Sequence, residues 1–235
     1  MDELDVGRKI MQCIFCKCPV SESSREHIVP ESLGNIEHLA PENSVCSECN
    51  SYFAVKIEKP VLDSPFMRFL RAERKIPNKK GRFLRIEKVG KDLSLPQPRH
   101  FSRFLGKIAL EAIAGRLFPT PGWNEEIVDN DSFDQLRDYV RRDRGAIWPF
   151  VYRTLYPANV VFQDNVTSFE VLHEYDFLLI DNQYLFFVFV LFGVEFSINM
   201  NDYSNSEFIK WSEENEHVSH LYSGKNAYQA GGGNG

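Results

Sequence analysis

The chain has 235 residues, of which 43% are hydrophobic, and a formal net charge of −6. This length and composition allow a well-buried core, and the longest apolar run, at residues 184–194, has only 11 residues and is too short to cross a bilayer as a helix. The amino terminus is acidic and lacks the hydrophobic region of a secretory signal. We therefore expect a cytoplasmic protein in a reducing compartment, with no membrane segment.

Four of the five cysteines form two Cys-x-x-Cys pairs, Cys13 with Cys16 and Cys46 with Cys49. Two such pairs are typical of a closed tetrahedral site for structural Zn²⁺, whereas a reducing compartment disfavours disulfides. Buried free thiols are the alternative. Cys18 is the fifth cysteine, and we expect it not to be a ligand, because Cys-x-x-Cys spacing suits a zinc knuckle better than the wider spacing that Cys18 would give.

The segment between the two pairs predicts a strand, a turn and a helix. Residues 26–30 favour a short β-strand, and residues 33–35 a turn out of it. A helix is predicted from Ser47 to about residue 59, where Pro60 should end it. Asn50 would then lie on the first helical turn, beside a zinc ligand and at a fixed distance from the strand.

Three segments, CIFC, EHIVPESLGN and NSVCSECNSYFA, resemble the zinc-ribbon branch of the HNH endonucleases, which are ββα-metal nucleases. The resemblance covers residues 13 to about 62. It implies that His27 is the general base and that Glu26 and Asn50 bind the catalytic metal. It also implies that Asn43, the middle residue of the motif, braces the loop and orients His27.

The chemistry of these residues agrees with those roles. A carboxylate and an amide oxygen, at Glu26 and Asn50, form a sparse set of hard ligands that suits Mg²⁺ or Mn²⁺. Imidazole exchanges protons near neutral pH, so His27 suits the activation of water. Taken singly, the three residues have plainer explanations as a solvated charge, a helix cap and a packed histidine. The sequence departs from the family pattern at Asn35 and Ala54, where glycine is usual, and both changes concern turn geometry rather than chemistry.

Charge is distributed unevenly along the chain. Residues 61–118 hold 14 Lys+Arg and 5 Asp+Glu, a balance of +9, whereas residues 1–60 carry −4 and residues 119–235 carry −11. A basic run directly after the catalytic helix favours contact with a nucleic-acid backbone, although a solvated surface is the alternative. This run contains Arg68, Arg71, Arg74, Lys75, Lys79, Lys80, Arg82 and Arg85.

A further helix is predicted from about residue 100 to residue 117. Apolar residues at helical spacing would form its buried face. Arg99, Arg103 and Lys107 are four residues apart, so we expect a basic stripe that faces the phosphates. The candidate nucleic-acid-binding residues are therefore Arg74, Lys75, Lys79, Lys80, Arg82, Arg85, Arg99, Arg103 and Lys107.

The remainder of the chain has the pattern of an α+β domain. Ser132 should cap a helix that Gly145 ends. The five expected strands cover residues 160–162, 168–172, 176–180, 184–191 and 194–199. A hairpin turn at residues 181–182 favours an antiparallel sheet, and a last helix is expected at residues 206–214.

We therefore expect an α+β protein with three parts: a zinc-stapled HNH module (residues 1–62), a basic segment with one helix (63–118) and an α+β domain (119–235). The resemblance favours a metal-dependent endonuclease acting on DNA, in anti-phage defence or restriction. The alternatives are a zinc-ribbon DNA-binding or adaptor protein that does not cleave, and an RNase. The last part shows no catalytic motif, and it is open to contact with a partner protein.

Overall fold

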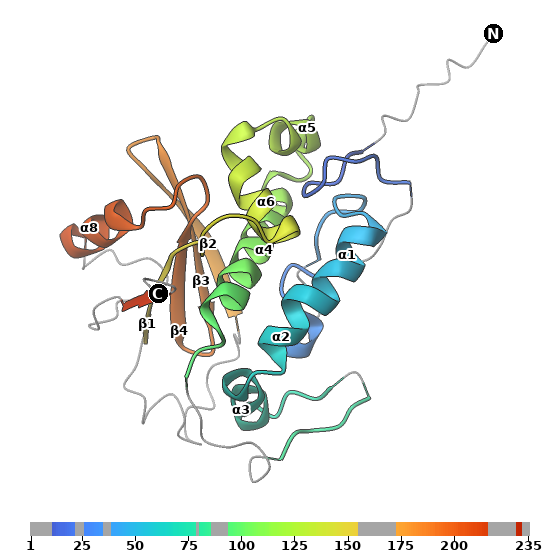
Figure 1. The fold of residues 1–235 in the computed structure, drawn as a ribbon, viewed down its shortest axis with the longest axis vertical. Coiled ribbons are helices and arrows are strands. Elements are labelled where there is room, and N and C mark those ends of the chain that lie inside the picture. Colours follow the sequence, from blue (N-terminus) through green and yellow to red (C-terminus); the bar gives the residue numbers. More distant parts are fainter. Residues whose placement is uncertain are drawn as a thin grey trace.

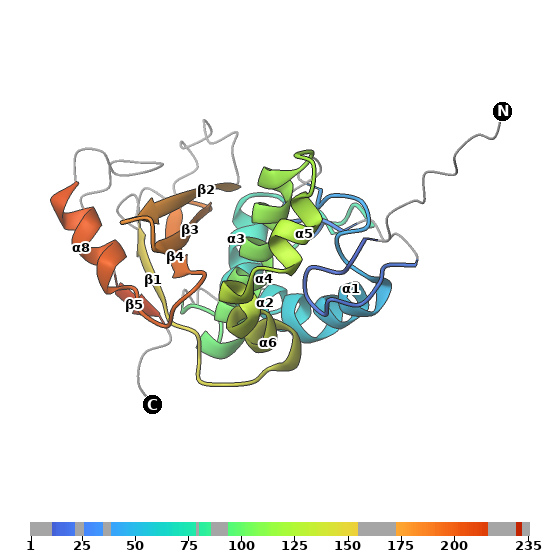
Figure 2. The same ribbon diagram turned by 90° about the horizontal axis from the view of Figure 1, so that it is seen from above.

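The computed structural model describes residues 11–21, 26–34, 39–78, 80–85, 94–154, 173–215 and 229–231. Helices and an antiparallel sheet share the molecule, so the expected α+β class is confirmed. Figures 1 and 2 show layers, with helix α8 on one side of the sheet, helices α4 to α6 on the other, and α1 and α2 beyond them. Among the described residues no helix is both long and apolar enough to cross a membrane.

The N-terminal module contains little regular β-structure. Isolated bridges join Gln12 to Pro19 and His27 to Leu39, and a 3-10 turn, η1 (Glu31–Leu33), follows directly. The prediction of a strand at residues 26–30 was wrong in extent, because the turn after Pro30 leaves room for only one bridge. The predicted turn is present: Gly34 has φ of 88°, a conformation that suits glycine, while Asn35 lies outside the described residues.

The predicted catalytic helix begins at Ser47, as expected, but it does not end at Pro60. Helix α1 (Ser47–Phe53) continues through a π-helical turn, η2 (Ala54–Glu58), into α2 (Lys59–Leu62). Within the π turn the Lys59 N–H donates to the Ala54 carbonyl, five residues back. A proline clashes with the carbonyl four residues before it in a regular α-helix, and the wider turn relieves that clash.

Two helices follow in the segment expected to be basic. Helix α3 (Pro65–Glu73), which the sequence did not predict, begins at Ser64, whose hydroxyl accepts a hydrogen bond from the Met67 N–H at 3.3 Å. Helix α4 (Pro98–Leu117) begins two residues before the predicted start, because proline fits the first turn of a helix. Residues on several sides of α4 are buried, among them Phe101 and Ile108, so it is a central helix.

A second helical group packs against α4. It consists of α5 (Trp123–Val128), which was not predicted, the 3-10 turn η4 (Asp131–Phe133), and α6 (Asp134–Arg142). The expected cap was displaced by two residues: the Asn130 side chain accepts from the Ser132 N–H, so Ser132 lies inside the turn. Asp143, with φ of 57°, ends α6, two residues before the glycine that was expected to do so.

The sheet has five strands in the order β2-β3-β4-β1-β5, and each neighbouring pair is antiparallel. Its strands are β1 (Phe150–Thr154), β2 (His173–Ile180), β3 (Tyr184–Leu191), β4 (Val194–Asn199) and β5 (Gln229–Gly231). The bounds of β3, β4 and helix α8 (Ser206–Glu214) agree with the prediction, as does the turn at Asp181 and Asn182, which have φ of 52° and 54°. β1 and β5 were missed, and the strands expected at residues 160–162 and 168–172 lie outside the described residues.

A single hydrophobic cluster runs from Cys13 to Met200. Helix α4 stands at its centre, in contact with η2 and α2 on one side and with β4 on the other. The core therefore crosses both of the predicted boundaries, at residues 62 and 118. The three-part division of the chain stays a prediction.

Candidate active site and cysteine cluster

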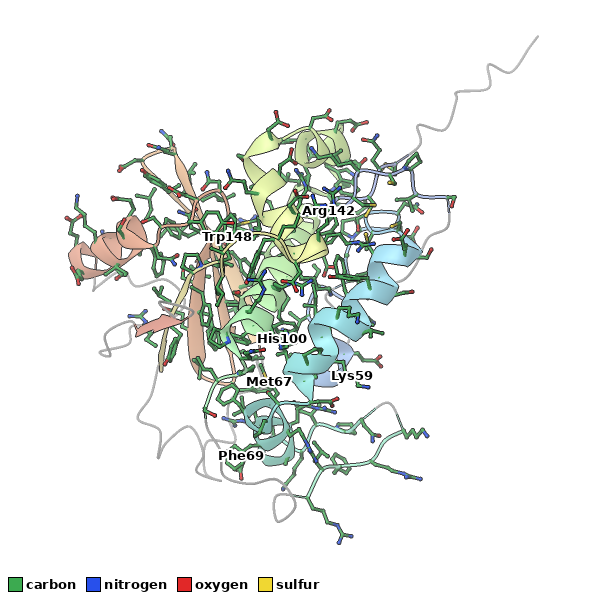
Figure 3. The ribbon with its side chains drawn as sticks, viewed as in Figure 1. Lys59, Met67, Phe69, His100, Arg142 and Trp148 are labelled. Carbon is green, nitrogen blue, oxygen red and sulfur yellow. The ribbon has the colours of Figure 1, made fainter. Side chains whose placement is uncertain are left out.

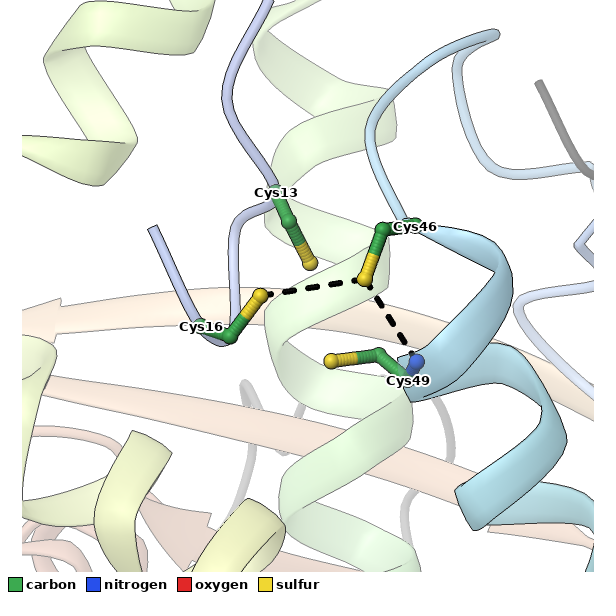
Figure 4. A group of neighbouring side chains, drawn as sticks. All are labelled: Cys13, Cys16, Cys46 and Cys49. Atoms are coloured by element: carbon green, nitrogen blue, oxygen red, sulfur yellow. Dashed lines mark hydrogen bonds between the residues drawn. The ribbon is translucent and has the colours of Figure 1, made fainter. Parts of the chain in front are cut away.

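The four cysteines of the two Cys-x-x-Cys pairs lie together (Figure 4). Cys13 and Cys16 come from the N-terminal loop, while Cys46 caps helix α1 and Cys49 lies in its first turn. Their sulfur atoms all lie within 4.8 Å of one another, and the Cys16 and Cys46 sulfurs are 3.7 Å apart. Tetrahedral zinc with Zn–S bonds of ~2.3 Å requires sulfur separations of roughly 3.8 Å, so the donor set fits zinc.

The environment of the sulfur atoms lowers the pKa of one cluster thiol and raises that of another. Hydrogen bonds from Cys16 and Cys49 lower the pKa of Cys13 to about 4, while the bond with Cys13 raises that of Cys49. The Arg141 Nε donates to the Cys49 Sγ at 3.1 Å, which supports negative charge on that sulfur. Cys18 is exposed and lies outside the four-cysteine group, in agreement with its predicted role as a non-ligand.

A pocket of about 380 Å³ lies between the loop after the first cysteine pair and the helix after the second. This volume is within the usual range for ligand sites. Glu26, His27 and Asn50, which the sequence singled out, all line it. The other lining residues are Pro30, Glu31, Ser32, Ala54, Glu58, Lys59, Leu62, Asp63 and Arg71.

Glu26 is held by a buried lysine. The Lys107 ammonium donates to the Glu26 Oε1 at 2.6 Å and also pairs with Glu58 at 2.8 Å and Glu111 at 3.0 Å. The side chains of Lys107 and Glu111 are both 0% exposed. The lysine thus binds Oε1 of a carboxylate that lines the pocket.

Burial and the neighbouring charges shift the pKa values of Glu26, Glu111 and Lys107. Burial raises the pKa of Glu26, and the Lys107 ammonium offsets only part of that effect. Burial likewise raises the pKa of Glu111 well above its ordinary value. Burial alone would lower the pKa of Lys107, but the Glu111, Glu58 and Glu26 carboxylates outweigh it and raise that pKa.

Two of the three residues of the basic stripe predicted on α4, Arg103 and Lys107, do not face solvent. Lys107 is fully buried, and Arg103 is 3% exposed, with its Nε and one terminal nitrogen donating to the Val140 carbonyl. The Arg99 Nε donates to Asp143 at 2.6 Å. The prediction that Arg103 and Lys107 contact phosphates was therefore wrong, because helix α4 is enclosed on both sides and its cations serve internal contacts with α6 and the pocket wall.

His27 lines the pocket, and its Nδ1 is buried without a hydrogen-bond partner among the described residues. The backbone around it is fixed by the bridge to Leu39 and by the Lys107 ammonium, which donates to the His27 carbonyl at 3.2 Å. The lysine thus supports two neighbouring pocket residues, Glu26 and His27.

The two asparagines of the motif lie in different places. Asn50 is in helix α1, one residue after Cys49, and lines the pocket as expected. Asn43 occupies a turn with φ of 62° and does not line the pocket. The neighbouring Ser44 carbonyl accepts from the Ile14 N–H at 2.9 Å, so this turn adjoins the first cysteine pair. The role of Asn43 in orienting His27 stays a prediction.

Comparison with known proteins matches residues 13–66 to the family model of an HNH endonuclease. This N-terminal segment is similar to the HNH endonucleases. The resemblance inferred from the sequence is thereby confirmed for this segment, and it suggests nuclease activity on a nucleic acid. No curated protein and no solved structure matches the chain.

The basic run lies immediately after the HNH module. Between α3 and α4, the Asn78 side chain accepts from the Lys80 and Arg82 N–H groups and closes a tight turn. Lys75, Lys80, Arg82 and Arg85 are exposed, Arg74 is half-buried, and Lys79 lies outside the described residues. Figure 1 shows this stretch as the extended loop beside α3.

Sequence reasoning missed residues in the pocket wall and behind it. Glu111 follows Lys107 by four residues, a spacing that does indicate an ion pair on a helix, but the stripe interpretation placed Lys107 against the phosphates. Glu58 lies inside the predicted helix, eight residues after Asn50, but no local pattern distinguishes it from a solvated charge. Arg71 was counted only as one of many basic residues, whereas it lines the pocket itself.

Proposed function

We propose that the protein is a metal-dependent endonuclease that hydrolyses phosphodiester bonds of DNA. The observation that supports this most directly is that Glu26, His27 and Asn50 line one pocket within an HNH endonuclease module. Glu26 and Asn50 would hold a Mg²⁺ or Mn²⁺ ion through oxygen atoms, which are the donors that these ions prefer. The cysteine cluster would hold Zn²⁺ in a structural role.

Each pocket residue has a distinct task in this proposal. His27 takes a proton from the attacking water through Nε2, and its fixed backbone keeps the ring over the pocket. Lys107 holds one Glu26 oxygen, which orients the other. When bound, the divalent ion stabilises the charge that develops on the phosphate and on the leaving oxygen.

The choice of DNA rests on the exposed basic residues beside the pocket. Lys75, Lys80, Arg82 and Arg85 extend from the end of α3, directly after the HNH module. Cations placed along a duplex release counterions from its phosphates, which gives affinity for any sequence. We therefore place the DNA backbone over this loop, with one strand entering the pocket.

Two further parts of the proposal concern context. Compact HNH modules resemble effectors of restriction and anti-phage defence, and we propose such a role in the cytoplasm. The sheet and α8 carry no catalytic group in this scheme, and we assign them to contact with a partner protein that activates or directs cleavage. A partner would bind the purified full-length protein in a pull-down experiment, and failure with every neighbouring gene product would count against this assignment.

The decisive experiment compares two histidine variants. His27→Ala should abolish nicking of supercoiled plasmid in Mg²⁺ while the zinc content and fold remain unchanged, because only the base is removed. His100→Ala is the matched control, since His100 lies near the start of α4 (Figure 3) and does not line the pocket. Full nicking by His27→Ala, or nicking that persists in EDTA, would contradict the proposal.

The same assay separates the alternatives. Matched RNA and DNA duplexes of one sequence distinguish an RNase from a DNase. A protein that binds DNA with steep salt dependence but never nicks it would instead be the adaptor that the sequence left open.

A further inference from the structure

Arg71 lies on helix α3, outside the segment that matches the HNH family, yet it lines the same pocket as His27. The helix places it one turn before the exposed basic loop. Arg71 is half-buried, whereas Arg68 on the preceding turn is exposed. Its position therefore joins the catalytic pocket to the basic surface.

The guanidinium of Arg71 has no hydrogen bond and no ion pair with any described residue, and its Nε is buried without a partner. Other arginines that pack against the helical core are satisfied. Arg137 pairs with Asp134 at 2.6 Å, and Arg141 with Glu48 at 2.6 Å. A buried donor without a partner costs free energy, so an unsatisfied arginine in a pocket calls for a ligand.

The charges of the lining side chains indicate which of them could bind an anionic ligand. Carboxylates from Glu26, Glu31, Glu58 and Asp63 line it, and the cationic side chains there are Lys59 and Arg71. Such a pocket repels an anion unless a cationic side chain binds that anion. Lys59 is exposed at the rim, whereas Arg71 is anchored by a helix whose Phe66 and Leu70 are buried.

We infer that Arg71 binds the scissile phosphate group opposite His27 and stabilises its charge during cleavage. This inference rests on the proposed function. A guanidinium presents two parallel N–H donors that match two phosphate oxygens, and in a water-poor pocket such a contact is stronger than at the surface. Burial lowers the pKa of Arg71, and the nearby Asp63 carboxylate offsets only part of that effect, so the guanidinium would gain from a further anionic partner.

The test compares Arg71→Ala, Arg71→Lys and Arg142→Ala. Arg142 is the control because it is exposed at the end of α6, pairs with Asp138 alone among the described residues, and lies well away from Lys59 (Figure 3). Two readouts are needed: the single-turnover rate on saturating supercoiled plasmid in Mg²⁺, and the salt dependence of binding to a labelled 20-base-pair duplex in Ca²⁺, in which we expect no cleavage.

Arg71→Ala should reduce the cleavage rate on the order of 100-fold, as loss of a preorganised donor does, and should flatten the salt slope by roughly 0.9. Arg71→Lys should keep the salt slope but lose much of the rate, because an ammonium lacks the paired donors. Arg142→Ala should match the wild type in both readouts.

A cleavage rate within about threefold of the wild type for both Arg71 variants would overturn the inference while leaving the proposed function intact. If Arg71→Ala proves unfolded by its zinc content and circular dichroism, Arg71→Lys decides alone, and an unchanged rate refutes the phosphate contact. If the wild type never cleaves, the proposed function fails. The salt slope in Ca²⁺ still tests the phosphate contact, and an unchanged slope in Arg71→Ala overturns it.

Discussion

The sequence and the structure predict different effects for the substitution Lys107→Met. The stripe interpretation places Lys107 against DNA, so the variant would lose affinity and keep its stability. The structure buries it at 0% exposure against Glu26, Glu58 and Glu111, so the variant should lose stability instead. Removing one partner of a buried ion pair costs about 3–5 kcal/mol, because a charge is left without compensation.

That cost is a large fraction of the ~5–15 kcal/mol by which domains are usually stable. With a denaturant dependence of roughly 2.5 kcal/mol per molar urea, the unfolding midpoint should fall by about 1–2 M. Adding Glu111→Leu should recover part of the loss, since it removes the most deeply buried carboxylate. Lys56→Met is the control, because Lys56 is exposed and does not line the pocket.

Urea unfolding followed by circular dichroism, beside duplex binding at several salt concentrations, measures both quantities. If Lys107→Met has the same urea midpoint as Lys56→Met, and its duplex affinity depends less on salt than that of the wild type, the buried network is refuted. Lys107 would then contact a phosphate, as the sequence predicted.

Three further outcomes are expected. Purified protein should carry about one zinc per chain, and Cys46→Ala should lose the metal together with the fold of its module, because the free energy of zinc binding stabilises the folded state. Well-folded protein without zinc by metal analysis would count against this. Burial raises the pKa of Glu111, so the folded state keeps a proton that the unfolded state releases. The contribution of this group to stability is therefore full below the ordinary glutamate pKa and declines as the pH rises above it. Thermal unfolding measured from pH 5 to 8 should depend less on pH in Glu111→Gln than in the wild type. Reversing Lys80 and Arg82 to glutamate should weaken binding to all duplexes alike and flatten the salt slope by roughly 0.9 for each phosphate that the protein no longer neutralises, and an unchanged slope would mean that DNA enters elsewhere.

Local signals in the sequence predicted the parts of the fold that local interactions determine. The hairpin at Asp181 and Asn182, strands β3 and β4, and helix α8 have the expected positions, because turn residues and apolar runs mark their ends. The spacing of the four-cysteine group likewise predicted a cluster that the structure brings together.

Predictions failed where tertiary contacts decide the outcome. The basic residues of α4 follow a surface-like spacing, but the helix is enclosed on two sides, and carboxylates distant in the sequence neutralise Lys107. No local pattern marks Glu58 as its partner. Proline at position 60 normally ends a helix, and only the wider turn before it, which a sequence does not display, allows the helix to continue.

The π turn at Ala54–Glu58 has a consequence for how the pocket is encoded. A π turn holds one residue more than an α-helical turn, and each residue rotates a helix by about 100°. Glu58 is the last residue of this turn and pairs with Lys107 at 2.8 Å. The extra residue is taken up within the single turn, so deleting Val55, which is 58% exposed, would let the turn return to α-helical geometry and leave the helix on either side in place. The deletion would instead bring back the clash between Pro60 and the carbonyl four residues before it, so its cost would fall on the continuation of the pocket helix through the proline.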